Sequence, residues 1–281
     1  AGGTGSRLYP ITKSLSKQLL PVYDKPMIYY PLSTLMSCGI KDILIIINPH
    51  DQNNFETLLG DGAQFGINLK YAIQEYPNGI AEAFIIGEEF IGDSSITLIL
   101  GDNIFHGSSL NILLKKFFKK NSGATIFAYP VKDPERYGVI EFDKLNKVIS
   151  IEEKPKHPKS IYAITGIYVF DNTVIKKAKS IKPSSRGELE ITDLHNMYLR
   201  EKNLSVNILE RGSAWLDTGN VDSLHEASSY IRTLEHRQGL KVGCPEEIAW
   251  KNNWINNSQL LKLSENFQKS GYGNYLKELL S

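Results

Sequence analysis

Two continuous apolar runs, residues 42–48 and 96–100, constrain the fold most strongly. Aliphatic runs of this length are typical of strands that are covered on both faces, as in parallel sheets. A further strand is expected near Leu69–Ile73, and helices are expected over 81–90 and 110–119. Because strands alternate with helices, this part of the chain predicts an α/β fold with a parallel sheet.

A helix is also expected ahead of the first apolar run. Asp24 and Lys25 precede Pro26, and proline is well tolerated in a first helical turn. The pattern therefore predicts a helix start at Pro26, a kink at Pro31 and a cap at Gly39.

The texture of the chain changes after residue 123. Short β-prone segments follow one another with little helix between them, which predicts added antiparallel strands, and the chain is mostly helical from Val221 onward. We expect a Rossmann-like α/β fold: a mixed, mainly parallel sheet flanked by helices, with an antiparallel portion and a helical C-terminal region. A single domain is expected over 1–281, with portions 1–123, 124–220 and 221–281. The β-prone segments are 124–131, 137–142, 147–153 and 162–170.

Composition excludes several classes of protein. The chain has 281 residues, 41% of them hydrophobic, and a net charge of +1, so it can bury a large core and shows no broad basic face for nucleic acid. No apolar run approaches the roughly 20 residues of a membrane span. The two cysteines, Cys38 and Cys244, lie far apart in sequence, which fits a reducing compartment. We therefore expect a cytoplasmic protein that binds neither nucleic acid nor membranes.

Three glycines open the sequence, at positions 2, 3 and 5, with Arg7 and Lys17 soon after. Glycines allow backbone N–H groups to approach an anion closely, and a guanidinium with an ammonium adds charge, so a polyphosphate is the expected guest. The alternative is a loop that needs glycine only to turn. The chain has no Gly-Lys pair for a P-loop, and Leu8 stands where a dinucleotide fingerprint needs its third glycine. Because such loops normally follow a buried strand, we expect a short apolar segment before Ala1.

Two aspartates are candidate metal ligands. Asp102 follows the second apolar run, at the strand end where open α/β sheets bind ligands. Asp217 lies in Trp-Leu-Asp-Thr-Gly, just ahead of the helix expected from Val221. Carboxylates beside a polyphosphate loop suit Mg²⁺. The alternatives are an Asp-Asn turn at Asp102 and a residue ahead of a helix cap at Asp217.

A fourth candidate is Glu153-Lys154-Pro155 at the end of a β-prone segment. Pro155 predicts extended backbone at Lys154, and the charged run has the alternative of a solvated strand edge. Other schemes are poorly supported: the chain has no Gly-x-Ser-x-Gly elbow, and its six histidines lack the spacing of a zinc site. Of the histidines, only His106 is expected near a site.

Taken in order, these motifs resemble those of the sugar-phosphate nucleotidylyltransferases. The resemblance extends through the whole chain. It is most specific in the stretch from Lys17 to Tyr30 and in Trp215–Gly219, and it includes Glu188–Asp193 and Cys244–Glu247. It implies a Mg²⁺-dependent reaction of dTTP with α-D-glucose 1-phosphate that gives dTDP-glucose and diphosphate, as the entry to deoxysugars of the dTDP-L-rhamnose type.

The resemblance also implies roles for individual residues. Arg7 would hold the departing diphosphate, Lys17 the nucleotide phosphates and Lys154 the sugar phosphate. The nucleotide would be bound by Gly2, Gly3, Thr4, Gly5, Gln74, Gly79 and Asp102, with Gln74 and Gly79 at the thymine edge; the sugar phosphate by Tyr137, Gly138, Glu153, Lys154, Ile164 and Arg186; and Mg²⁺ by Asp102 and Asp217.

Some points stay open at this level. Use of UTP or another nucleotide, and a non-catalytic sensor of nucleotide sugars, are alternatives, because one methyl group distinguishes thymine from uracil. A dinucleotide-dependent oxidoreductase is disfavoured by Leu8. His106-Gly107-Ser108 departs from the usual Tyr-Gly-His of the family, which leaves feedback inhibition at a second nucleotide site in doubt. By analogy, the C-terminal helices predict a homotetramer.

Overall fold

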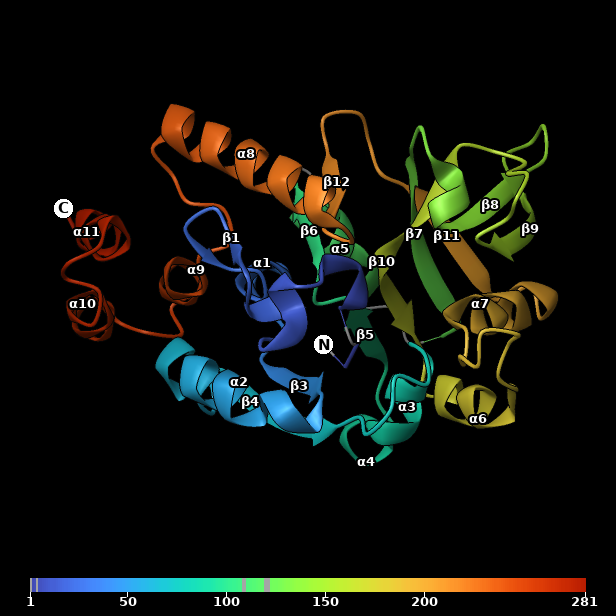
Figure 1. Ribbon diagram of the computed structural model, residues 1–281, viewed down its shortest axis with the longest axis horizontal. Helices are drawn as coiled ribbons and strands as arrows, with labels where there is room; N and C mark the ends of the chain where they lie inside the picture. Colours follow the sequence, from blue (N-terminus) through green and yellow to red (C-terminus); the bar gives the residue numbers. More distant parts are fainter. Residues whose placement is uncertain (1, 4, 108–109, 119–121) are drawn as a thin grey trace. The chain divides into compact units, whose positions relative to one another are not determined.

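The computed structural model describes residues 2–3, 5–107, 110–118 and 122–281, and the chain forms two compact units (Figure 1). Unit 1 assembles segments that are far apart in sequence, whereas the two segments of unit 2 are separated only by residues 101–106. Of the helices in the described ranges, none is both long and apolar enough to cross a bilayer. The single domain predicted over 1–281, with its three portions, stays a prediction. Unit 1 comprises Ala1–Glu75, Gly101–His106 and Leu216–Ser281; unit 2 comprises Tyr76–Leu100 and Gly107–Trp215.

Unit 1 is built around two parallel strands, β3 (Asp42–Ile47) and β4 (Asn68–Ile73), which pair from Asp42↔Asn68 to Ile47↔Ile73. Both strands were predicted. After β3 the chain forms the 3₁₀ turn η4 (Pro49–Asp51), where Asp51 Oδ1 accepts a hydrogen bond from Ser16 N–H of the N-terminal loops. The other elements of this unit are η1 (Ser6–Leu8), η2 (Ile11–Lys13), η3 (Lys17–Leu19), β1 (Pro21–Val22), β2 (Lys25–Pro26), α1 (Tyr29–Ser37), η4 (Pro49–Asp51), α2 (Gln52–Leu59), η5 (Ala63–Phe65), β6 (Asn103–His106), α8 (Val221–Gln238), α9 (Pro245–Lys251), α10 (Asn257–Glu265) and α11 (Gly271–Glu278).

The first long helix begins later than predicted. Lys25 and Pro26 form β2, and α1 starts at Tyr29. Pro31 therefore lies in the first turn, where its missing N–H breaks no helical hydrogen bond, and α1 continues through it instead of kinking. The predicted cap is confirmed: Gly39 has φ +90° and donates its N–H to Met36 O at 2.9 Å.

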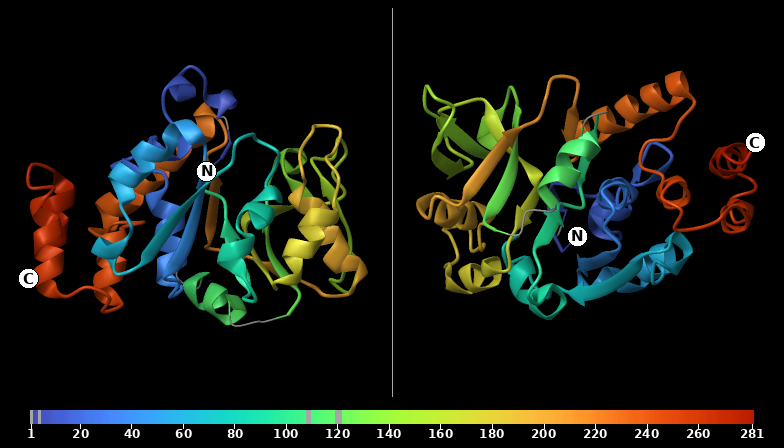
Figure 2. Two further views of the ribbon diagram at one scale, coloured as in Figure 1. Left: turned by 90° about the horizontal axis from the view of Figure 1, so that it is seen from below. Right: turned by 180° about the vertical axis from the view of Figure 1, so that it is seen from behind.

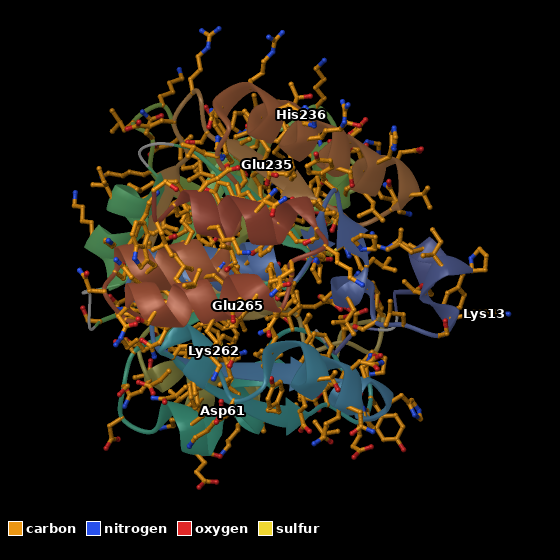
Figure 3. The ribbon with its side chains drawn as sticks, turned by 90° about the vertical axis from the view of Figure 1, so that its left-hand side faces the viewer. Lys13, Asp61, Glu235, His236, Lys262 and Glu265 are labelled. Carbon is orange, nitrogen blue, oxygen red and sulfur yellow. The ribbon has the colours of Figure 1, made fainter. Side chains whose placement is uncertain are left out.

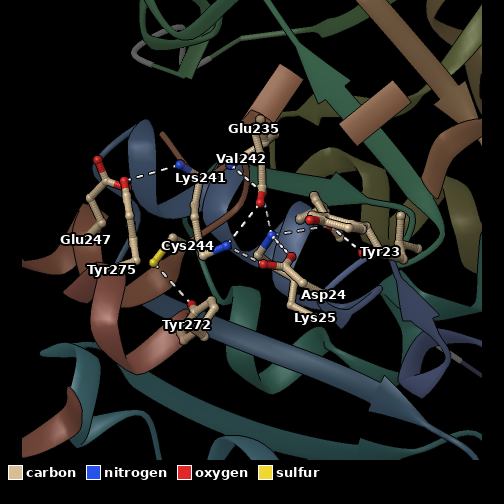
Figure 4. Close-up of polar contacts among 12 residues, drawn as sticks. Tyr23, Asp24, Lys25, Glu235, Lys241, Val242, Cys244, Glu247, Tyr272 and Tyr275 are labelled. Atoms are coloured by element: carbon tan, nitrogen blue, oxygen red, sulfur yellow. Dashed lines mark hydrogen bonds and ion pairs between the residues drawn. The ribbon is translucent and has the colours of Figure 1, made fainter. Parts of the chain in front are cut away.

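The helical C-terminal region of unit 1 is joined to the β1–β2 hairpin by buried charges (Figure 4). The Lys25 ammonium, on a residue only 3% exposed, lies 2.5 Å from Asp24 Oδ1 and 2.7 Å from Glu235 Oε1. Lys241 contacts the other oxygen of each carboxylate. Burial of Asp24 raises its pKa, but the two ammonium groups outweigh this and hold the pKa below its usual value. Each of these charges therefore has partners of opposite sign.

Unit 1 also carries two C-terminal helices and an exposed lysine near its N-terminus. Helices α10 and α11 lie side by side near the C-terminus (Figure 2). Lys13, at the end of η2, extends away from the ribbon (Figure 3).

Unit 2 contains a six-stranded mixed sheet in which β10 (Tyr162–Phe170) is the central strand. It pairs antiparallel with β5, β7 and β8, while β11 pairs parallel with β7 and β9 pairs antiparallel with β8. Helix α7 packs against β9 and β11, and α6 packs against α7 (Figure 1). The other strands are β5 (Ile96–Ile99), β7 (Ala124–Pro130), β8 (Gly138–Phe142), β9 (Val148–Glu153) and β11 (Leu204–Ile208); the helices are α3 (Glu82–Ile86), α4 (Glu88–Ile91), α5 (Leu110–Phe118), η6 (Pro134–Arg136), α6 (Thr173–Ser180) and α7 (Ile191–Arg200).

The predicted fold class is confirmed: the protein is α/β, with a mixed sheet flanked by helices, an antiparallel portion and a helical C-terminal region. Antiparallel pairing is more extensive than predicted, because β10 brings β5 into the sheet that holds the later strands. The helix expected over 81–90 is present as α3 and α4, which are separated at Gly87.

The core of unit 2 buries one histidine. His195, on α7, is 0% exposed and stacks on the Phe170 ring with centroids 5.8 Å apart. Within the part of the chain that the structure describes, neither ring nitrogen has a hydrogen-bond partner. Because burial disfavours the charged imidazolium, the pKa of His195 is lowered to about 3.

This burial predicts an acid-sensitive fold. The unfolded chain takes up a proton at His195 near pH 6.5, whereas the folded chain does so only near pH 3, so stability falls as the pH drops through that window. We expect His195→Phe to reduce the loss of unfolding free energy between pH 7 and pH 4.5 by about 2–3 kcal/mol. Urea unfolding at both pH values measures the change in unfolding free energy. His225→Gln serves as the control, because His225 is exposed. An equal loss in both variants would contradict the prediction.

Candidate functional site

The glycine-rich loop of unit 1 is shaped by close packing. Gly2 lies so close to the Gln74 amide oxygen that a side chain at position 2 would displace it. Gly5 has φ +62°, and its carbonyl oxygen accepts hydrogen bonds from Thr12 Oγ1 at 2.7 Å and from Leu8 N–H at 2.9 Å. Geometry favours glycine at both positions: at Gly5 the backbone is left-handed, and at Gly2 a Cβ would push the Gln74 side chain aside. Thr4, also predicted here, lies outside the described residues.

The two predicted cations on this loop have different surroundings. Arg7, in η1, is exposed. Lys17, the first residue of η3, is only 7% exposed, and its ammonium contacts Asp102 Oδ2. Asn103 Nδ2 donates to Asp102 Oδ1 at 2.9 Å. Burial raises the pKa of Asp102, but Lys17 and Asn103 outweigh it and hold that pKa below its ordinary value. Asp102 is therefore ionised at neutral pH.

In unit 1 the backbone segment that carries Asp217 lies next to Asp102. Thr218, the residue after Asp217, donates to Asp102 O through its N–H at 3.2 Å and its Oγ1 at 2.8 Å. Asn220, and not Asp217, caps α8, through a reciprocal hydrogen bond with Ser223. The two carboxylates thus belong to adjoining backbone segments, although Asp102 and Asp217 lie far apart in sequence.

This donor set fits a hard divalent cation. Mg²⁺ binds one or two protein carboxylates and completes its shell with water and phosphate oxygens. Among the described residues no group of three His, Cys, Asp or Glu side chains is gathered in the manner of an all-protein metal cage. Asp102 and Asp217 therefore suit an ion that arrives with a phosphate ligand, and they remain a predicted pair.

In unit 2 the predicted side chains converge on Glu153, at the end of β9. Thr192 Oγ1 donates to Glu153 Oε2, and Arg186 Nη2 lies 3.4 Å from Glu153 Oε1. Lys154 Nζ lies 3.8 Å from the same Oε1. Arg186 is also bound by Glu190, at 2.7 Å. The side chains of Lys154 and Arg186 are 40% and 38% exposed, so the carboxylate between them can accept hydrogen bonds from hydroxyl groups while the two cations bind a phosphate.

The backbone at Lys154 differs from the prediction. Extended geometry was expected because Pro155 follows, but Lys154 has φ +43°. Its N–H donates to Tyr137 O at 3.0 Å, which turns the chain at the end of β9. Left-handed backbone is uncommon for a residue with a side chain, and such conformations concentrate at functional sites.

The remaining sugar-side predictions lie around the same strand ends. Gly138 faces Glu153: a Cβ there would meet Ile164 Cδ1 at 3.3 Å and Glu153 Oε2 at 3.5 Å. The Tyr137 ring packs edge-on against Trp215, with centroids 5.0 Å apart. Glycine at 138 thus leaves room beside the carboxylate, and an aromatic pair lies next to it.

Gly79 lies in unit 2 and is required for packing. It has φ +107°, and a Cβ would lie 2.5 Å from Leu189 O and 2.6 Å from Leu189 N. Its predicted contact with thymine stays a prediction. His106, at the end of β6 in unit 1, has its ring 6.0 Å from that of Tyr230, and burial lowers its pKa.

Sequence reasoning missed several supporting residues. Thr218 and Thr192 lie in motifs that were noted, but without a role of their own. Asn48 and Asp51 were not noted; polar residues directly after a buried strand were the available signal. The predicted site residues divide between the units: Gly2, Gly3, Gly5, Arg7, Lys17, Gln74, Asp102 and Asp217 in unit 1, and Gly79, Tyr137, Gly138, Glu153, Lys154, Ile164 and Arg186 in unit 2.

Comparison with known proteins gives a consistent result. Residues 1–233 match the family described as Nucleotidyl transferase. Glucose-1-phosphate thymidylyltransferase of Neisseria meningitidis is 57% identical over 280 residues, which cover 100% of this chain and 97% of that protein. The enzyme of the same name from Mycobacterium tuberculosis is 56% identical with the same coverage.

Solved structures agree. A crystal structure of a putative glucose-1-phosphate thymidylyltransferase from Bacillus anthracis, in complex with a sucrose, is 44% identical. It has a TM-score of 0.77 and covers 83% of this chain and 93% of its own. A UDP-glucose pyrophosphorylase complexed with UDP-glucose is 24% identical, with a TM-score of 0.72 over 83% of this chain and 97% of its own, and so supports the fold alone.

The close approach at Gly79 leads to a stability prediction. Gly79→Ala should lower the free energy of unfolding by about 1–3 kcal/mol more than Gly187→Ala, because the new methyl group meets the Leu189 backbone. Gly187 is a matched control: it has φ +78° but no atom within 4 Å of its Cβ position, so only backbone strain is added. Urea midpoints of the two variants measure the difference, and equal midpoints would count against it.

Proposed function

Because the chain belongs to the nucleotidyl transferase family, we propose that it is a glucose-1-phosphate thymidylyltransferase. It joins dTTP and α-D-glucose 1-phosphate to give dTDP-glucose and diphosphate. The similarity to enzymes of that name over the full chain supports the choice of reactants.

The geometric observation that carries the proposal is the junction at Asp102. Lys17 contacts its carboxylate, and Thr218 holds its backbone beside Asp217. One buried cation and two carboxylates therefore lie in the unit that also carries the glycine-rich loop. This is the combination that a triphosphate with a bound divalent cation requires.

The chemistry explains why no catalytic serine or histidine was found. A phosphate oxygen of glucose 1-phosphate attacks the α-phosphorus of dTTP, and the bond from that phosphorus to the bridging oxygen of the diphosphate breaks. The attacking oxygen is already ionised at neutral pH, so no general base is needed. The protein must instead hold two anions that repel each other, and such alignment can lower the barrier by roughly 7–11 kcal/mol.

Each predicted residue has a part in this task. Arg7 and Lys17 bind and neutralise the phosphates of the nucleotide, and the glycine loop supplies N–H donors. Gln74 and Gly79 contact the thymine edge. Lys154 and Arg186 bind the sugar phosphate. Glu153 accepts hydrogen bonds from hydroxyl groups of the glucose, and the sugar ring is surrounded by Tyr137, Gly138 and Ile164.

Asp102 and Asp217 would hold the Mg²⁺ ion, which supplies charge neutralisation at the phosphates when bound. In the structure the Lys17 ammonium contacts Asp102 Oδ2 and holds the pKa of that carboxyl below its ordinary value. A homotetramer and a cytoplasmic location stay predictions of the same proposal.

The test is a diphosphate-release assay with glucose 1-phosphate and each of dTTP, UTP, CTP, ATP and GTP. We expect the highest kcat/KM with dTTP and no release in EDTA. The thymine methyl contact is worth only about 1–3 kcal/mol, so dTTP and UTP have to be compared directly. A preference for UTP of more than tenfold would favour the alternative nucleotide. Binding of dTDP-glucose without any turnover would favour the non-catalytic sensor.

A second test separates the two reactants. Lys154→Ala should raise KM for glucose 1-phosphate about tenfold to a hundredfold, the loss expected for a charge-assisted hydrogen bond, and leave KM for dTTP within about twofold. Lys156→Ala, an exposed lysine two positions on, is the matched control. If both KM values rise equally in Lys154→Ala, Lys154 does not bind the sugar phosphate.

A further inference from the structure

Two polar side chains after β3 reach both N-terminal loops of unit 1. Asn48 Nδ2 donates to Gly3 O at 3.2 Å, and the same Nδ2 lies 3.5 Å from Asp51 Oδ2. Asp51, in η4, is only 8% exposed. A carboxylate that is this buried needs hydrogen-bond donors, and Asn48 supplies one of them.

The other oxygen of Asp51 holds the loop that carries Lys17. Ser16 N–H donates to Asp51 Oδ1 at 3.1 Å, and Ser16 directly precedes η3, whose first residue is Lys17. Ser16 Oγ also donates to Gln18 Oε1 at 2.8 Å, so the turn around Lys17 is fixed on both sides. Hydrogen bonds to an ionised acceptor are among the stronger ones.

The segment from Gly5 to Ser16 carries Arg7. Near its start, Thr12 Oγ1 donates to Gly5 O, and at its end Ser16 N–H donates to Asp51 Oδ1. Gly3, just before it, is bound by Asn48. Side chains from the end of one buried strand therefore set where the glycine loop and Lys17 lie with respect to each other.

We propose that Asn48 and Asp51 form a clip that fixes the spacing between the glycine-rich loop and Lys17, and that Asp51 is a positioning residue for the triphosphate. Asp51 acts through Ser16 and not by contact with the nucleotide. The inference rests on the proposed function, since it takes these loops to bind dTTP. Spacing matters because a displacement of about 1 Å at reacting groups can cost about a hundredfold in rate.

The experiment compares Asp51→Ala and Asn48→Ala with Tyr71→Phe. Tyr71, on β4 of the same unit, donates its hydroxyl to Gly60 O at 2.6 Å, so its variant loses a comparable hydrogen bond away from the clip. Two quantities are measured for each protein: the Kd of dTTP by calorimetry in magnesium buffer, and kcat and KM for both reactants. Asp51→Asn is included in case Asp51→Ala fails to fold. Its amide oxygen can still accept the hydrogen bond from Ser16 N–H.

In Asp51→Ala and Asn48→Ala we expect the Kd of dTTP to rise, and kcat/KM for dTTP to fall, by about tenfold or more, with KM for glucose 1-phosphate changed less than about twofold. Asp51→Asn should show a smaller loss, and Tyr71→Phe none. The double variant should lose less than the product of the single losses, because both residues act on one clip.

Two results overturn the clip: dTTP binding in Asp51→Ala and Asn48→Ala that matches Tyr71→Phe, or equal losses for both reactants. Wild-type protein that binds dTTP but releases no diphosphate would contradict the proposed function alone, since the calorimetric comparison still tests the clip. Wild-type protein that does not bind dTTP would overturn both.

Discussion

The contact between Lys17 and Asp102 is the interaction on which the candidate site of unit 1 depends. It places an ammonium and a carboxylate against each other in a partly buried setting. Without the carboxylate, burying Lys17 would cost free energy, and without the ammonium the same holds for Asp102. The Thr218 hydrogen bonds to Asp102 O extend this pair to Asp217, so one junction organises the cation and both acids.

Each unit solves a different electrostatic problem. Unit 1 offers cations and glycine N–H groups with two acids, a set suited to a polyphosphate that brings its own divalent ion. Unit 2 offers Glu153 between Lys154 and Arg186, and Arg186 is also paired with Glu188 and Glu190, a set suited to a ligand with hydroxyl groups and a single phosphate. The left-handed backbone of Lys154 belongs to this second set and marks a place where local preference yields to the turn at the end of β9.

Several supporting residues belong to no motif that a sequence search finds. Asn48, Asp51 and Thr12 hold the loops through backbone atoms of Gly3, Ser16 and Gly5, and any residue type can supply such a carbonyl or N–H. These three side chains and their partners therefore form no motif that can be found in the sequence. Thr192 is hidden for a different reason: its hydroxyl donates to the side chain of Glu153, but the two residues lie 39 positions apart in sequence.

Local sequence patterns predict the strands at 42–47 and 68–73 and the cap at Gly39, because hydrophobic period and glycine act locally. They did not determine the start of α1, because Lys25 is drawn into a buried ion pair with Glu235 across 210 positions. Nor did they determine that Asp102 and Asp217 adjoin, or that Lys154 turns to positive φ. Those features depend on hydrogen bonds between distant segments, and only the tertiary structure brings such segments together.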